Sequence, residues 1–83
     1  MEHVLLISRL GSQIRETRIR RGLTQARLAE LAGLTRQKVI AVEKGTHSVA
    51  MNAYARALSA LDCELAVVPA TMPTLEELGE LFE

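Results

Sequence analysis

The feature that most constrains this chain is the run LTQARLAELAGLTRQKVIAVEKG, residues 23–45, in which two short helical patterns follow each other across one glycine. Thr24 and Thr35 are residues that cap helix N-termini, so each can start a pattern. Gly33 and Gly45 end the patterns, because glycine readily takes the left-handed conformation found after a helix. The run therefore predicts two helices of about two turns each, joined by a tight turn.

Longer apolar patterns flank this pair of helices. Leu6, Leu10 and Ile14 have helical spacing and predict a helix over roughly residues 5–21, which Gly22 can end. After a loop, helical spacing returns at Ala53, Ala57, Leu58 and Leu61. The sequence therefore predicts a mainly α fold of four to five helices.

The segment ELAVVP, residues 64–69, has a different texture, since it is rich in β-branched residues and closes with Pro69. It predicts one short strand over residues 64–68. An exposed single strand is an aggregation hazard, and the economical partner is the same strand of a second copy. We therefore expect a homodimer whose interface residues are Leu65, Ala66, Val67 and Val68. The alternative is that the segment packs as an extended tail on the fourth helix of its own chain.

These patterns divide the chain into three parts. They are a helical domain over residues 1–62, a dimerisation strand over residues 63–69, and an acidic tail or short helix over residues 70–83. In the tail, Thr74 and Glu77 have the spacing of a capping box. The apolar residues that would share one face of this helix, and could bind a partner, are Leu75, Leu78 and Phe82. A frayed acidic end, or a helix packed on its own dimer, is the alternative.

Charge and composition exclude several functional classes. Residues 9–44 carry nine cations and three acids, whereas residues 57–83 carry six acids and no cation, so a polyanion is the expected partner of the first part. One cysteine, Cys63, and two distant histidines give neither a disulfide framework nor a metal site, and no catalytic motif is present. We therefore expect that the protein is not an enzyme and that it binds no cofactor, metal or membrane. We expect it to be cytoplasmic.

Both short helices are expected to begin with cations in place of acids. Arg27, Arg36 and Lys38 fall in first turns, where the helix dipole disfavours positive charge by about 0.3–1 kcal/mol each. Violations of a local rule are expected at functional sites. An external anion would meet unpaired backbone N–H groups and cations together, and nucleic acid supplies phosphates in a row.

Residues 10–61, and above all the quoted run, resemble the phage repressor and Cro-like helix-turn-helix family, also called the XRE family. The resemblance implies that the second helix of the pair reads the major groove of double-stranded DNA. It assigns base contacts to Arg36, Gln37, Ile40 and Ala41, with Arg36 suited to guanine, Gln37 to adenine and Ile40 to a thymine methyl group. The expected phosphate contacts are Thr24, Gln25, Arg27, Thr35, Lys38, Lys44, Thr46 and His47. Among Arg15, Arg18, Arg20 and Arg21 of the first helix, we expect about two to touch DNA.

A strand directly after a four-helix core is similar to the arrangement in Hip-type antitoxins. This resemblance implies a repressor that autoregulates its operon by binding an inverted-repeat operator, with a toxin protein as a further partner. Two alternatives stay open: a stand-alone XRE-type regulator of another operon, and a protein-interaction module that acts through the acidic tail.

Overall fold

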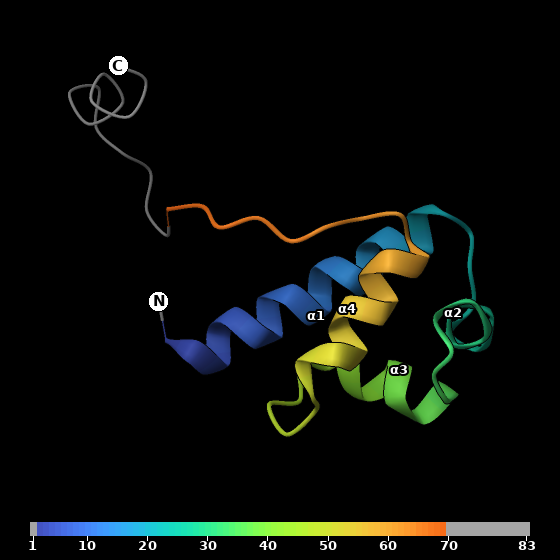
Figure 1. The fold of residues 1–83 in the computed structure, drawn as a ribbon, viewed down its shortest axis with the longest axis horizontal. Coiled ribbons are helices and arrows are strands. Elements are labelled where there is room, and N and C mark those ends of the chain that lie inside the picture. The colour runs from blue at the N-terminus through green and yellow to red at the C-terminus, as the bar shows by residue number, and fades with distance from the viewer. Residues whose placement is uncertain (1, 70–83) are drawn as a thin grey trace, which may run out of the picture.

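The computed structural model describes residues 2–69, which form a bundle of four α-helices (Figure 1). The helices are α1 (His3–Arg20), α2 (Gln25–Ala32), α3 (Arg36–Glu43) and α4 (Met51–Ala60). The four predicted helices are therefore confirmed, and α1 begins about one half-turn earlier than the apolar spacing indicated. The fifth helix predicted in the tail lies outside the described residues.

The ends of α2 and α3 follow from local side chains. The hydroxyl oxygen of Thr24 accepts a hydrogen bond from the Arg27 N–H at 3.0 Å, and that of Thr35 accepts one from the Lys38 N–H at 3.1 Å. Gly33, with φ of 68°, ends α2 in the left-handed conformation. These bonds satisfy one orphan N–H at each helix start and fix the turn between the two helices.

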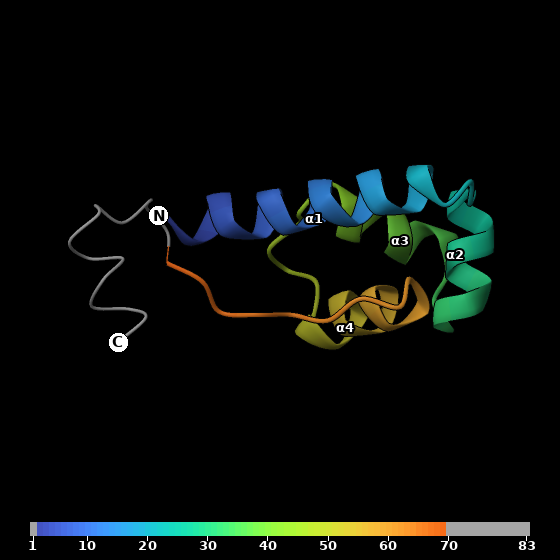
Figure 2. The ribbon, with the colours of Figure 1, turned by 90° about the horizontal axis from the view of Figure 1, so that it is seen from above.

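The core lies where all four helices meet. In Figure 2, α1 and α4 run along opposite sides of the bundle, with α2 across one end. The largest fully buried side chains are Ile14, Leu28, Leu61, Val39 and Val42. Leu28, Val39 and Val42 fill the core, whereas Leu34 is half-buried and packs at the edge of the core.

The backbones of α1 and the end of α3 touch at two glycines. A Cβ atom added to Gly11 would collide with the Val42 carbonyl oxygen and would lie 2.8 Å from the Gly45 nitrogen. A Cβ atom added to Gly45, whose φ is 70°, would lie 2.9 Å from the Ser8 nitrogen. This close approach fixes the position of α1 along its axis relative to the end of α3, so the exposed residues of the two helices keep a fixed arrangement.

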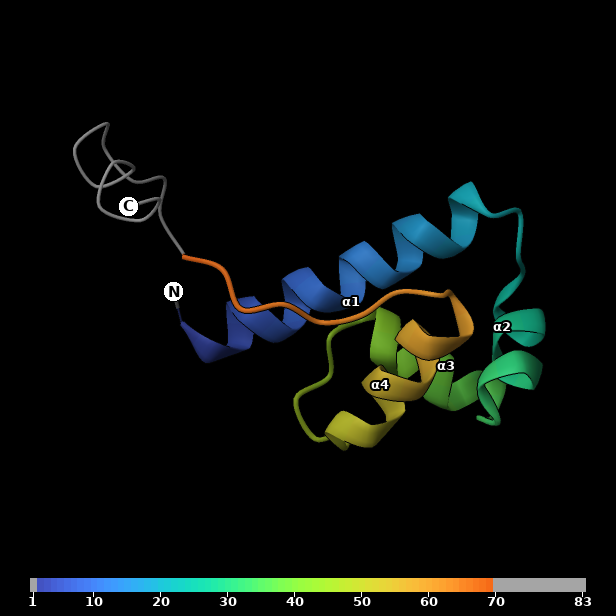
Figure 3. The same cartoon turned by 45° about the horizontal axis from the view of Figure 1, so that its top comes forward.

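The structure assigns no strand to the predicted segment 64–68, and residues 63–69 form an extended stretch beside the helices (Figure 3). A strand is defined by hydrogen bonds to a neighbouring strand, and a single copy of the segment has no such neighbour. The alternative, packing on the fourth helix, holds only for Cys63, which is half-buried against the core, because residues 64–69 are exposed. Pairing with a second copy stays a prediction.

Within residues 2–69, no helix has both the length and the apolar character that crossing a bilayer requires.

Candidate nucleic-acid interface

Burial of two valines sets the rotation of α3. Val39 and Val42 are 0% exposed and turn one face of α3 into the core. Arg36 and Gln37 consequently lie exposed on the outer side, with Ile40 and Ala41 half-buried beside them. The structure thus brings together at the surface the four residues that were expected to contact bases. An exposed guanidinium, an amide and an aliphatic side chain are groups that can read major-groove edges.

The first turns of α2 and α3 contain no acidic residue. The positive ends of the two helix dipoles are therefore left without a negative side chain of their own, which favours binding of an anion. Thr24 and Thr35 use their hydroxyl oxygens as acceptors within the caps, so each hydroxyl hydrogen remains able to donate to a phosphate.

A buried ion pair holds Gln25, the first residue of α2, in place. Arg18 of α1 donates from Nε to Glu43 Oε2 at 2.6 Å and from Nη2 to Glu43 Oε1 at 3.1 Å. Gln25 Nε2 donates to the same Glu43 Oε1 at 3.3 Å. Arg18 also donates from Nη1 to the Leu23 carbonyl at 2.8 Å, so the network ties α1, the start of α2 and the end of α3 together. One amide N–H of Gln25 remains for an external acceptor.

This ion pair is a feature that the sequence analysis missed. Arg18 was counted among the α1 arginines of which about two were expected to touch DNA, but it is only 8% exposed, and Glu43 is 7% exposed. The available signal was spacing, since Gly11, Ile14 and Arg18 fall on one helical face and all three are buried. Arg18 therefore positions the helices and does not present its charge at the surface.

The other acids of residues 9–44 also pair with cations. Glu16 lies 4.0 Å from Arg20, and Glu30 lies 2.7 Å from Arg27, both at exposed positions. A phosphate contact by Arg27 would have to compete with this exposed pair, which is worth little in water. Among the described residues of this stretch, the cations without an ion pair are Arg9, Arg15, Arg21, Arg36, Lys38 and Lys44.

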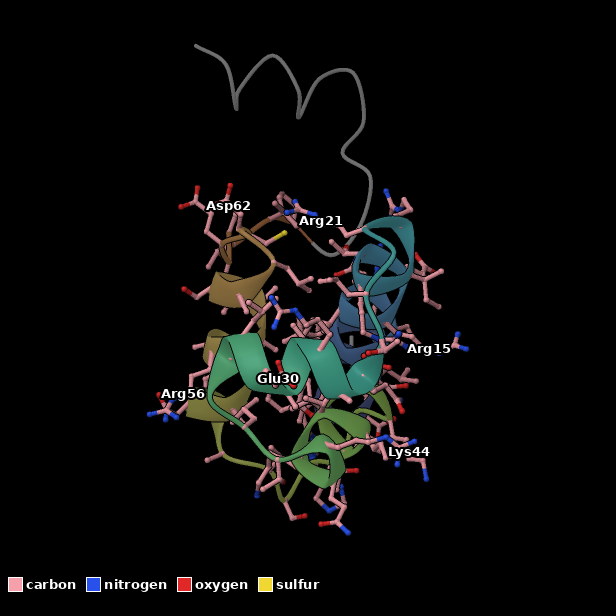
Figure 4. All side chains as sticks on the ribbon, turned by 90° about the vertical axis from the view of Figure 1, so that its right-hand side faces the viewer. Arg15, Arg21, Glu30, Lys44, Arg56 and Asp62 are labelled. Atoms are coloured by element: carbon pink, nitrogen blue, oxygen red, sulfur yellow. The ribbon has the colours of Figure 1, made fainter. Side chains whose placement is uncertain are left out.

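Some of these cations gather on one side of the molecule. Figure 4 shows Arg15 of α1 and Lys44, the residue that follows α3, pointing outward on the same side. Arg56 of α4 points away from them on the other side, where its Nη1 donates to the Gly33 carbonyl at 3.2 Å. Arg15 and Lys44 therefore form a basic surface that joins α1 to the end of α3, and Arg56 of α4 is not part of it.

The turn after α3 contains the last two expected phosphate contacts. His47 is exposed and Thr46 is half-buried. The Thr46 carbonyl accepts a hydrogen bond from the Tyr54 hydroxyl at 3.0 Å, which attaches this turn to α4. Desolvation by burial raises the pKa of Tyr54 above its ordinary value of 10.0. The hydroxyl thus stays protonated and keeps donating to the turn at neutral pH.

The residues expected at the dimer interface are all exposed in the single chain. Leu65, Val67 and Val68 are 54%, 104% and 72% exposed, and Ala66 is exposed as well. Leu75, Leu78 and Phe82 lie outside the described residues. No group of three metal-ligating side chains occurs in the described part of the chain.

Comparison with known proteins gives two similarities. Residues 9–71 match the helix-turn-helix domain family. A stretch of 35 residues, 42% of this chain, is 60% identical to an uncharacterized HTH-type transcriptional regulator of Methanothermobacter thermautotrophicus. That stretch covers 51% of the archaeal protein, so this chain spans about half the length of the relative it matches.

Proposed function

Since this chain belongs to the helix-turn-helix domain family, we propose that it is a transcriptional repressor that binds double-stranded DNA sequence-specifically. In this proposal α3 enters the major groove and α2 lies across the DNA backbone. The observation that carries the proposal is the outer side of α3, where Arg36, Gln37, Ile40 and Ala41 lie together at the surface while Val39 and Val42 anchor the helix from behind.

Specific recognition is assigned to base edges. Arg36 donates two hydrogen bonds to a guanine, Gln37 bonds to an adenine, and Ile40 contacts a thymine methyl group. Ala41, which is small and half-buried, lets the groove floor approach α3. The apolar character of Ile40 and Ala41 leaves room for recognition of DNA shape at those positions.

The DNA backbone is assigned to the helix N-termini and the cations around them. Gln25, braced by Glu43, donates to one phosphate, and Thr24, Arg27, Thr35 and Lys38 surround the two helix starts. Lys44, Thr46 and His47 flank the other end of α3. These contacts fix the register of α3 in the groove and carry most of the salt dependence of binding.

The repressor acts as a homodimer that joins two copies of segment 64–68 and recognises an inverted repeat. Half-sites are then about 34 Å apart, one turn of the double helix. The exposed apolar residues of the segment support this arrangement, since an unpaired extended segment of this composition invites pairing.

Within the family, the run of residues 23–45 supports assignment to the XRE branch, and the segment after α4 supports a Hip-type antitoxin that autoregulates its operon and binds a toxin protein. A stand-alone regulator of another operon is the second candidate, because it would share every residue assigned to DNA. Co-purification with the product of the neighbouring gene distinguishes the two, since only the antitoxin forms such a complex.

Fluorescence anisotropy tests DNA recognition. The full chain is titrated onto labelled duplex from immediately upstream of its gene and onto unrelated duplex, at two salt concentrations. We expect tight, salt-sensitive binding to the upstream duplex. Arg36→Ala should lose about 1–3 kcal/mol of this binding and relax the preference at one base pair.

Arg56→Ala is the matched control, because it also removes an arginine, but one of α4 that points away from Arg15 and Lys44 (Figure 4). It should bind the upstream duplex like the wild type. Equal, weak binding to both duplexes that Arg36→Ala leaves unchanged would show that α3 does not read DNA.

A further inference from the structure

The first two turns of α1 project beyond the rest of the bundle (Figures 1 and 2) and contain a run of apolar residues between His3 and Ser8. Val4, Leu5 and Leu6 are 39%, 56% and 51% exposed. With Ile7 they form four consecutive apolar residues, which at roughly 3.6 residues per turn encircle the helix. A helix that is apolar all round is normally enclosed by protein, so these turns need more cover than the described chain supplies.

A second apolar surface runs toward the same end of the molecule. Residues 63–69 pass from the end of α4 back along α1, in the direction of its N-terminus (Figures 1 and 3). Val67 and Val68, on the part of this segment nearest the α1 N-terminus, are the most exposed large apolar residues described. In both surfaces the exposed apolar residues are consecutive in the sequence, unlike apolar residues scattered singly over a surface.

The same segment borders a groove that could receive an apolar helix. A cavity of about 440 Å³ lies between α1, α4 and residues 63–66. The lining combines the apolar residues Leu10, Ile14, Leu58, Cys63, Leu65 and Ala66 with the polar residues Gln13, Glu16, Thr17, Arg20 and Glu64. The groove is therefore at the start of segment 63–69, whereas the bare turns of α1 are near its end.

We propose that in the homodimer the first two turns of α1 of each protomer dock into this groove of its partner. The proposal rests on the homodimer of the proposed function. When two copies of segment 64–68 pair antiparallel about a two-fold axis, residue 68 of one lies opposite residue 64 of the other. Segment 63–69 runs toward the end of the molecule that holds the first turns of α1 (Figure 1), so the same two-fold axis directs these turns toward the partner's residues 63–66 and the groove beside them.

A second copy is the occupant that fits best, because one symmetry operation covers both apolar surfaces at once. Each copy donates an apolar helix end and receives one, so the contact is reciprocal, as a two-fold interface requires. Residues 4–7 contain no charge that a partner would have to neutralise. The contact also enlarges an interface that five residue pairs of a short strand would otherwise make alone.

Sedimentation equilibrium of the full chain tests the contact. Leu5→Glu and Leu6→Glu should weaken dimerisation by about tenfold or more, because each replaces an apolar contact with a carboxylate in a groove that already holds the acids Glu16 and Glu64. Both changes put a negative charge near the N-terminus of α1, where the helix dipole favours it, so the helix itself is preserved. Leu31→Glu, at a leucine of α2 that is 48% exposed, is the matched control and should leave the dimer intact.

The outcomes separate this inference from the proposed function. A dimer that Val67→Glu dissociates but Leu5→Glu and Leu6→Glu do not would overturn the docking of α1 and leave the strand-paired homodimer standing. A wild-type chain that is monomeric at all concentrations would remove the homodimer itself, and the docking with it.

Hydrogen exchange identifies the occupant. Amides of residues 6–9, in the second turn of α1, should be protected in the wild-type dimer and lose protection in monomeric Val67→Glu. Protection that persists in the monomer would mean that another part of the same chain covers α1, and would overturn the proposal.

Discussion

Arg18 and Glu43, the two residues of the buried ion pair, hold α1, α2 and α3 together beside the candidate DNA-binding surface. Arg18 and Glu43 have side chains 10% and 3% exposed, and the Glu43 carboxylate also accepts from Gln25. Glu43→Gln leaves the Arg18 charge without its counter-ion, which should cost about 3–5 kcal/mol. Urea unfolding followed by circular dichroism measures this loss.

The double variant Arg18→Met/Glu43→Leu separates stability from positioning. Replacing both charges with apolar groups of similar size should recover most of the stability that Glu43→Gln loses. Gln25 would still lack its anchor, so binding to the upstream duplex should stay weaker than in the wild type. Full recovery of DNA affinity together with stability would show that the ion pair serves the fold alone.

Tyr54 links stability to alkaline pH. Its pKa is raised by burial in the folded state, so the unfolded chain loses the hydroxyl proton at lower pH than the folded chain does. Stability from this group is therefore fully present below about pH 10 and should fall as pH rises from there through the folded pKa. Tyr54 is the only tyrosine of the chain, so tyrosinate absorbance reports its titration directly.

Tyr54→Phe is the control for this pH effect. At neutral pH it should lose about 1 kcal/mol, because the Thr46 carbonyl loses its hydrogen-bond donor. Above about pH 10 the difference from the wild type should shrink, since the wild type alone has this hydroxyl to ionise. A constant difference across the alkaline range would contradict the raised pKa.

At the scale of elements, α4 begins less well than α2 and α3. Ala50 occupies its N-cap position and makes no side-chain hydrogen bond to the first turn. Ala50→Ser should supply the missing acceptor and raise the free energy of unfolding by about 0.5–2 kcal/mol. Ala50→Gly is the comparison, since glycine suits the backbone but offers no oxygen, and thermal unfolding of the three chains ranks them.

The elements also show how far the sequence predicted the structure. Thr24 and Thr35 cap the starts of α2 and α3, and Gly33 ends α2. These interactions involve only neighbouring residues, so these helix boundaries were predictable from local chemistry. The contact of Gly11 with Gly45 and the pairing of Arg18 with Glu43 join residues 34 and 25 positions apart, which no local pattern specifies. Gly11, a glycine inside a helical pattern, was a hint of the first contact, because it costs about 1 kcal/mol relative to alanine and implies a close approach.

The same distinction applies to the candidate site. The resemblance to the repressor family indicated which side of α3 is exposed, and the burial of Val39 and Val42 agrees with it. It could not predict that Glu43 braces Gln25, because that bond depends on how α1 and α2 meet the end of α3. Segment 64–68 is the opposite case: its composition favours a strand, but a strand needs a neighbour that one copy does not contain.

At the scale of the whole molecule, dimerisation should couple stability to concentration. If two copies bury the segment 64–68 and the first turns of α1, unfolding also separates the protomers. Each tenfold rise in protein concentration then adds about 1.4 kcal/mol to the stability per mole of dimer, so Tm should rise with concentration. Differential scanning calorimetry over a hundredfold concentration range measures this shift.

Val67→Glu provides the decisive comparison, because Val67 lies outside the helical core and is fully exposed in a single copy. The variant should keep the four-helix circular dichroism spectrum while its Tm becomes lower and independent of concentration. This follows because the core around Ile14, Leu28 and Val39 is complete within one chain, whereas residues 64–68 gain burial only from a second. A wild-type Tm that does not move with concentration would mean that the single protomer is the unit that unfolds, and would contradict this coupling.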